Sequence, residues 1–176
     1  MRRFQTCLAV ILDHEGGKSD NPVDRGGRTA YGITQRTYDA YRAKRGLPAR
    51  DVWQIDMSEV REIYFADYWT KVRADSLPEP LDLHLFDAAV NCGVSRASKW
   101  LQQSLDMPDA DGRIGPVTLA YVNDAVQADE IDYIVSRFLG ERRTHYMRLV
   151  LADGTQNAFL NGWMNRVANI ERIGNA

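Results

Sequence analysis

Two carboxylates lie in one polar, glycine-rich stretch of the chain, residues 13–34. Glu15 closes an apolar run, Asp24 follows with eight residues between them, and Thr29 comes five positions later. Glycosidic bonds are usually cut by such a pair, one carboxyl donating a proton to the leaving oxygen while the other stays ionised. The pattern predicts Glu15 as a general acid, Asp24 as a base or charge-stabilising group, and Thr29 as a residue that holds a water.

The surroundings of the two carboxylates differ in polarity. Glu15 ends an apolar helical segment, where partial removal from water favours the neutral, proton-donating form. Asp24 lies among glycines and polar residues, which suit an ionised group. Each residue alone also has a structural explanation, as a helix end or a turn residue. The long polar loop that joins them favours a functional interpretation. If Asp24 acts as a base, the two carboxyls should lie about 6.5–9.5 Å apart.

The elements that must position these residues are mostly helical. Apolar residues recur with helical spacing from Phe4 to Leu12, which predicts a first helix over residues 3–14 that glycines end. The pair Gly26-Gly27 predicts a turn in a short β-hairpin within the loop that follows. Strand patterns are almost absent elsewhere, so the predicted fold class is mostly α with a short β-hairpin or loop region after the first helix.

Capping residues and helix breakers delimit the remaining helices. Thr34, Asp56 and Ser95 are expected N-caps, the second as part of a capping box with Glu59. Pro116 suits the first turn of another helix. The expected ranges are 34–44, 56–70, 81–91, 95–105, a helix from 116, 129–151 and 158–172. The segment 81–91 is apolar almost all round, which predicts a central helix.

Length and composition describe an ordinary globular protein. The 176 residues suit one domain, or one domain with a small lobe, and the formal charge of −2 gives no bias toward nucleic acid. No apolar run approaches the ~20 residues of a membrane span, so no stable membrane insertion is expected. The run at 7–12 is short and lacks a cleavage site behind it, which predicts synthesis in the cytoplasm without a cleavable signal peptide.

The cysteines and histidines do not form a metal-binding pattern. Cys7 and Cys92 lie in apolar, helix-like contexts, which favours free thiols over a disulfide. The three histidines are far apart in sequence, so no metal site is expected. No cofactor is expected either.

Several short motifs occur along the chain in a recognisable order. They include Glu15-Gly16-Gly17, Asp20-Asn21-Pro22-Val23-Asp24, Gly26-Gly27, Thr29, Gly32-Ile33-Thr34, Asp87-Ala88-Ala89-Val90-Asn91-Cys92-Gly93 and Gly162-Trp163-Met164-Asn165-Arg166. Together they resemble glycoside hydrolase family 108, whose members are N-acetylmuramidases (lysozymes) of phages and of bacterial secretion-linked systems. The resemblance implies a lysozyme-like fold with Glu15 as the catalytic acid. Phage-type lysozymes space a Glu, an Asp and a Thr similarly, with five residues rather than the present four between the last two.

The resemblance also implies a substrate and a domain organisation. The expected reaction is hydrolysis of the β-1,4 bond between N-acetylmuramic acid and N-acetylglucosamine in peptidoglycan glycan strands, by a monomer acting in the periplasm or cell wall. A holin or a secretion-associated route would release such an endolysin or muramidase. The segment from Asp111 to Thr118 resembles peptidoglycan-binding helical modules. We therefore expect a catalytic lobe over 1–93 and a predicted peptidoglycan-binding lobe over 94–176, packed as one globular unit.

Four further residues are candidates for contact with sugar. Asp87 and Asn91 are four positions apart on the expected central helix and so share a face. Tyr31 and Trp69 are candidates to stack on sugar rings. The alternative for the two polar residues is that they satisfy buried backbone groups, and the alternative for the aromatic residues is a place in the core.

Two other functions remain open from the sequence. A lytic transglycosylase would use Glu15 alone and close the sugar onto itself, leaving anhydro ends. A non-catalytic cell-wall-binding or secretion-accessory protein would use the loop only to grip glycan. Product analysis distinguishes all three, because only hydrolysis adds water to the products.

Overall fold

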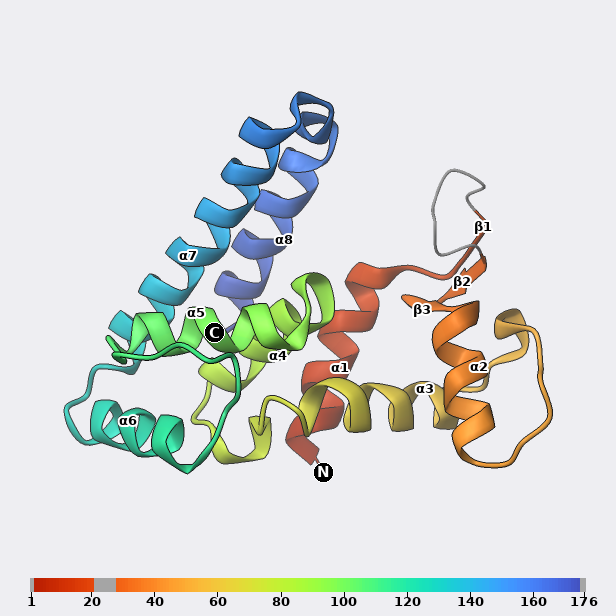
Figure 1. Ribbon diagram of the computed structural model, residues 1–176, viewed down its shortest axis with the longest axis horizontal. Helices are drawn as coiled ribbons and strands as arrows, with labels where there is room; N and C mark the ends of the chain where they lie inside the picture. The colour runs from red at the N-terminus through yellow and green to blue at the C-terminus, as the bar shows by residue number, and fades with distance from the viewer. Residues whose placement is uncertain (1, 21–27, 175–176) are drawn as a thin grey trace. The chain divides into compact units, whose positions relative to one another are not determined.

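The computed structural model describes residues 2–20 and 28–174 and shows a mostly α chain (Figure 1). The chain forms two compact units, one ending at Asp67 and the other beginning at Tyr68. The division into 1–93 and 94–176, which follows sequence motifs and not packing, stays a prediction. No helix among the described residues combines the length and the apolar composition needed to cross a membrane.

The first unit begins with helix α1 (Arg2–Glu15), whose apolar side buries Phe4, Leu8 and Ile11. Gly16, with φ +69°, follows the last helical residue, as the glycine pair predicts. The helix therefore delivers Glu15 to the point where the chain leaves regular structure. The predicted helix over 3–14 is confirmed.

A small antiparallel sheet follows α1. Its strands are β1 (Lys18–Asp20), β2 (Arg28–Ala30) and β3 (Ile33–Thr34), in the order β1-β2-β3. The strands β2 and β3 form a hairpin through the two-residue turn Tyr31-Gly32, and both turn residues have positive φ, +51° and +73°. Two left-handed residues are the signature of the turn that matches the twist of a hairpin. The turn expected at Gly26-Gly27 lies outside the described residues.

Helices α2 (Gln35–Lys44) and α3 (Met57–Tyr64) complete the first unit, with a 3₁₀ turn, η1 (Val52–Gln54), between them. Thr34 caps α2 by accepting a hydrogen bond from the Thr37 N–H at 3.2 Å. Asp56 and Glu59 form the predicted capping box of α3. The chain continues from α3 as a π-helix, η2 (Phe65–Trp69), so the predicted range 56–70 is confirmed although its last part is not α-helical.

Among the described residues of the second unit, every regular element is a helix. These elements are η3 (Ala74–Ser76), α4 (Leu81–Cys92), α5 (Val94–Ser104), α6 (Pro116–Gln127), α7 (Ile131–Ala152), η4 (Gly154–Gln156) and α8 (Asn157–Gly174). Every residue from 81 to 89 is buried, and α4 packs against α5, α7 and α8, which confirms the predicted central helix. Figure 1 shows α7 and α8 side by side, joined by η4.

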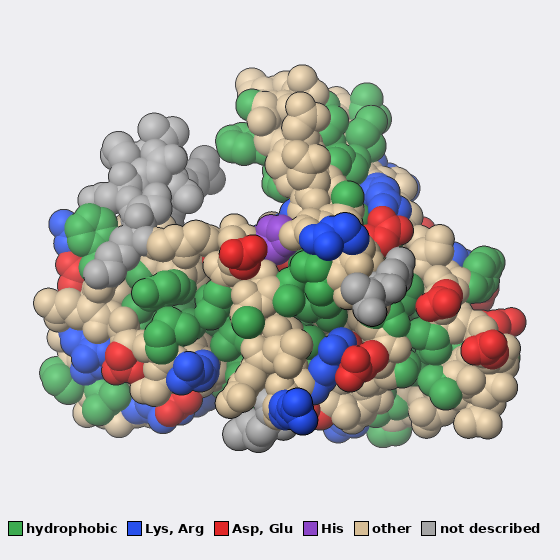
Figure 2. All heavy atoms as spheres, turned by 180° about the vertical axis from the view of Figure 1, so that it is seen from behind, with side chains coloured by type: hydrophobic (Ala, Val, Ile, Leu, Met, Phe, Trp, Pro, Cys, Tyr) green, Lys and Arg blue, Asp and Glu red, His purple; other side chains and the backbone are tan. Residues whose placement is uncertain are grey.

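Two details of the second unit bear on the predictions. Helix α5 begins after Gly93, which has φ +91°, so the prediction of Ser95 as its N-cap is wrong by two residues. Cys7 is buried in the first unit and Cys92 is half-buried in the second, and both are reduced thiols in the structure. On the face shown in Figure 2, acidic and basic side chains are scattered in small groups among apolar side chains.

Candidate active site

The carboxyl group of Glu15 packs directly against the turn of the β2–β3 hairpin. A Cβ atom placed on Gly32 would lie only 2.7 Å from Oε2 of Glu15 and 2.7 Å from the hydroxyl oxygen of Tyr64. The position thus needs glycine for two reasons: its positive φ and the space that these two side chains occupy. The hairpin turn is shaped around the half-buried Glu15 side chain.

Hydrogen bonds hold that turn in place from two sides. The Tyr64 hydroxyl donates to the carbonyl oxygen of Tyr31 at 2.9 Å. The Tyr31 N–H donates to the carbonyl oxygen of Gly17 at 3.2 Å. The turn is consequently tied both to the end of α3 and to the chain just beyond α1, and the Tyr31 side chain itself is half-buried.

Thr29 lies in the middle of β2, on the strand that leads into this turn. It pairs with Ser19 of β1 and Thr34 of β3, and its side chain is half-buried. The β2–β3 hairpin thus carries both Thr29 and the turn that packs against Glu15. Asp24 lies outside the described residues, so its separation from Glu15 stays a prediction.

Trp53 supports β2 from outside the sheet, and the sequence analysis missed it. Its Nε1–H donates to the carbonyl oxygen of Thr29 at 3.3 Å. The guanidinium of Arg28 lies 4.7 Å from the centre of the Trp53 ring and forms an ion pair with Asp51 at 2.5 Å. Asp51 in turn accepts a hydrogen bond from the Trp53 N–H at 2.9 Å. The Asp51 side chain before a 3₁₀ turn is the one local signal that could have indicated this arrangement.

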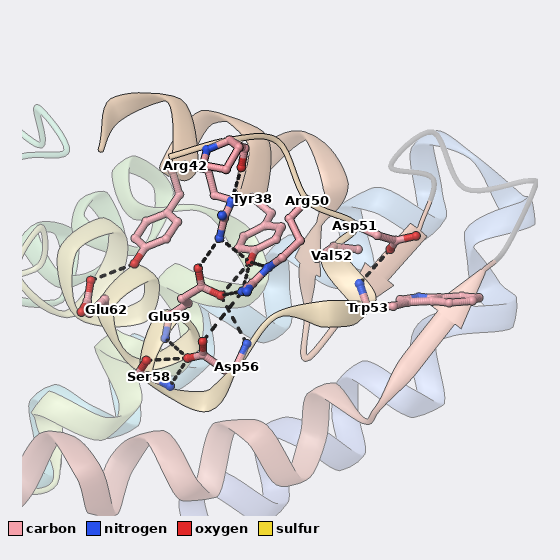
Figure 3. A network of polar contacts seen from close by, with 12 residues as sticks. Tyr38, Arg42, Arg50, Asp51, Val52, Trp53, Asp56, Ser58, Glu59 and Glu62 are labelled. Carbon is pink, nitrogen blue, oxygen red and sulfur yellow. Dashed lines mark hydrogen bonds and ion pairs between the residues drawn. The ribbon is translucent and has the colours of Figure 1, made fainter. Parts of the chain in front are cut away.

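A buried cluster around Glu59 fixes the segment that carries Trp53 (Figure 3). The Glu59 carboxylate accepts hydrogen bonds from the Tyr38 hydroxyl at 2.6 Å and from Arg42 at 2.7 Å, and it also pairs with Arg50. Burial and the hydrogen bond to Glu59 raise the pKa of Tyr38. Gln35 continues the connection by donating to the Arg50 carbonyl oxygen at 2.9 Å. The loop before η1 is therefore anchored to both α2 and α3.

Asp87 lies in the core of the second unit as a structural ion pair. Its carboxylate accepts hydrogen bonds from Arg142 at 2.6 Å and from Arg166 at 2.7 and 2.9 Å. Burial alone would raise the pKa of Asp87, but the two guanidinium groups outweigh it and hold that pKa below its usual range. A carboxylate with no exposed surface cannot contact a sugar, so Asp87 does not belong to a binding surface.

The other two sugar-contact candidates in the second unit differ from each other. Trp69 is fully buried and packs edge-to-face on Phe86, with ring centres 5.2 Å apart. Its ring has no free face for a sugar, so the core explanation holds for Trp69. Asn91 is exposed, and its Oδ1 accepts a hydrogen bond from the Tyr146 hydroxyl at 2.6 Å. Among the described residues, no three Cys, His, Asp or Glu side chains gather as a metal ion would require.

A mostly α fold, with a glutamate at the end of the first helix packed against a small antiparallel sheet, defines the lysozyme-like class. Residues 8–93 match the model of the family described as Glycosyl hydrolase 108, and residues 96–168 match the one described as Predicted Peptidoglycan domain. The chain therefore belongs to glycosyl hydrolase family 108. It is a glycoside hydrolase that acts on peptidoglycan.

A solved structure supports this assignment over almost the entire chain. The structure described as that of Brucella abortus SagA is 31% identical in sequence and superposes with a TM-score of 0.79. The match covers 98% of this chain and 93% of that one. No curated protein is similar enough in sequence to match the chain.

Proposed function

We propose that the enzyme is an N-acetylmuramidase that hydrolyses the β-1,4 bond between N-acetylmuramic acid and N-acetylglucosamine, with Glu15 as the general acid. The observation that carries this proposal is the packing of the Glu15 carboxyl against the Tyr31-Gly32 turn. A carboxyl group enclosed by a glycine turn and a tyrosine hydroxyl is held in one position, which general acid catalysis requires.

The reaction follows from the roles of the three residues. Protonated Glu15 donates its proton to the glycosidic oxygen, the bond to the anomeric carbon breaks, and positive charge develops on the sugar ring. Asp24 stabilises that charge or takes a proton from the attacking water, and the Thr29 hydroxyl holds the water. The water supplies the hydroxyl group of the new reducing end.

The proposed substrate is the glycan strand, and the proposed site of action is the cell wall. A monomer can perform this chemistry, because all three proposed catalytic residues come from one chain. A holin or a secretion-associated route would bring an endolysin or secretion-linked muramidase of this kind to its substrate.

Mass spectrometry of digested, purified cell walls tests the bond and the reaction type. The proposal predicts products with N-acetylmuramic acid at the reducing end and with one water added at each cut. Anhydro ends would instead identify a lytic transglycosylase. Binding to cell walls without any new reducing ends would leave only a wall-binding protein.

A further inference from the structure

A cavity lies in the helical unit, within residues that match the Predicted Peptidoglycan domain. It has a volume of about 690 Å³ and opens between the loop after α5 and the first turn of α6. Such a volume is within the range of small-ligand sites, ~300–1,000 Å³. Its walls include Gln102, Asp109, Asp111, Arg113, Pro116 and Val117. None of these residues takes part in the site around Glu15.

The walls of this cavity are held rigid by one buried amide. Gln102 is 2% exposed, and its Nε2 donates to Asp111 Oδ1 at 2.7 Å and to the Arg113 carbonyl oxygen at 3.1 Å. Its Oε1 accepts a hydrogen bond from the Gly112 N–H at 2.8 Å. A buried amide whose donors and acceptor are satisfied by one loop fixes the backbone of that loop. The cavity is therefore formed before any ligand binds.

Close packing on α5 supports the same conclusion. Gly112 has φ +79°, and a Cβ atom there would lie 2.5 Å from the Ser95 hydroxyl oxygen and 2.8 Å from the Ser95 carbonyl oxygen. Only glycine can bring the loop this near to the helix. The loop is thus shaped by α5 as well as by Gln102. A loop that only connects two helices needs neither the close approach at Gly112 nor the buried amide.

The cavity presents charges of both signs beside an apolar wall. Hydrogen bonds from Gln102 and from the Arg113 backbone lower the pKa of Asp111, which keeps this carboxylate ionised. Asp109 and Arg113 are exposed at the same cavity, and Val117 is 65% exposed. The described residues that line it include no aromatic side chain on which a sugar ring could stack.

We infer that this cavity binds the peptide stem of peptidoglycan, with Arg113 on a stem carboxylate and the acidic residues on its free amine. Where a peptide is attached, the sugars carry no charge, because the lactyl carboxyl of N-acetylmuramic acid forms the amide bond to the peptide. The peptide stems carry both carboxylates and a free amine. A guanidinium matches a carboxylate with two parallel hydrogen bonds. The inference rests on the proposed function only in taking peptidoglycan as the ligand, and it gives the helical unit a role distinct from bond cleavage.

The test measures binding of peptidoglycan peptides in solution, using the full chain carrying Glu15→Gln so that the wall is not degraded. We expect this protein to sediment with intact purified walls. Peptides released from those walls by an amidase should bind to it, measured by calorimetry. No binding of the released peptides would overturn the inference.

A matched pair of arginine variants localises the binding. Adding Arg113→Gln should weaken binding of the released peptides at least ~10-fold, the usual effect of losing a charge-assisted hydrogen bond. Adding Arg148→Gln instead removes the same charge from an exposed site on α7 and should leave the affinity for the released peptides unchanged. Equal affinities of the two variants would contradict the assignment to this cavity. A Glu15→Gln chain that still cleaved walls would refute the catalytic proposal alone, because the peptide titration does not depend on cleavage.

Discussion

The carboxylate oxygen Oε2 of Glu15 lies where a side chain at Gly32 would begin, 2.7 Å from the position of a Cβ atom. The backbone at Gly32 thus packs directly against the carboxyl group of Glu15. The relationship explains why a hairpin turn with two positive φ angles stands immediately over the end of α1. It also predicts that a side chain at position 32 would displace the Glu15 carboxyl group and so impair catalysis.

Replacing Gly32 by alanine should therefore impair catalysis more than stability. A left-handed alanine costs about 1–2 kcal/mol, and the new methyl group must displace Glu15 or the Tyr64 hydroxyl. Gly46→Ala is the matched control, because its φ is +66° and a Cβ atom there would meet nothing within 4 Å. Both variants should lower the melting temperature, and only Gly32→Ala should lower kcat at least ~10-fold. Equal kcat values for the two variants would contradict the packing argument.

Trp53→Phe should lower kcat while leaving KM nearly unchanged. The substitution keeps an aromatic ring beneath Arg28 but removes the donor to the Thr29 carbonyl oxygen. A positioning hydrogen bond of this kind contributes on the order of 1 kcal/mol, which corresponds to a several-fold loss of rate. Steady-state kinetics on soluble glycan fragments measure both constants. A variant with wild-type kcat would show that Trp53 does not position β2.

Asp87→Asn should destabilise the fold strongly. The change leaves the fully buried Arg142 without its counter-charge, and breaking a buried ion pair costs about 3–5 kcal/mol. Asp106→Asn breaks an exposed pair with Arg137 and should change the stability little, because solvent screens such a pair. Urea unfolding gives both values. Asp87→Asn with normal stability but reduced glycan binding would restore Asp87 to the substrate site.

His84 should make stability depend on pH in the mildly acidic range. Burial lowers the pKa of His84 from 6.5 to about 4, because the α4 core disfavours the imidazolium. As pH falls from 6.5, the unfolded chain binds a proton that the folded chain does not, so stability decreases until about pH 4. The loss is on the order of 3 kcal/mol.

His84→Leu isolates that contribution, since it places a side chain of similar size but without a titratable group at the same position. As pH falls from 7 to 4, the free energy of unfolding should decrease more for the wild type than for the variant. Parallel pH profiles for the two proteins would show that His84 is not responsible.

Local signals explain why most helix boundaries were predictable. The caps at Thr34 and Asp56 act on backbone groups within three residues, so the sequence itself contains the interaction. Gly93 was missed as the N-cap of α5 because Ser95 has the better capping side chain, yet Ser95 lies inside α5, close to the backbone of Gly112. That contact comes from a distant loop, which no local pattern records.

The candidate acid, Glu15, could be predicted from the sequence, but the residues that surround it could not. Glu15 is recognisable from its position between an apolar helix and a glycine pair. The contact of Glu15 with Gly32 joins segments that are far apart in the sequence, and so does the hydrogen bond from the Tyr64 hydroxyl to the Tyr31 carbonyl oxygen. Helical spacing placed Asp87 on one face with Asn91 but could not show that Arg142 lies opposite, 55 residues later.

The most direct test of the account is the rate at which the Glu15→Gln enzyme releases reducing ends from purified cell walls. The amide keeps the shape of the side chain but has no acidic proton that it could transfer, and general acid catalysis contributes about 10²- to 10⁴-fold to rate. We predict a loss of that size with an unchanged melting temperature, while Glu62→Gln, at an exposed ion pair with Arg45, keeps wild-type activity. Release of reducing ends by Glu15→Gln at the wild-type rate would contradict the assignment of Glu15 as the acid.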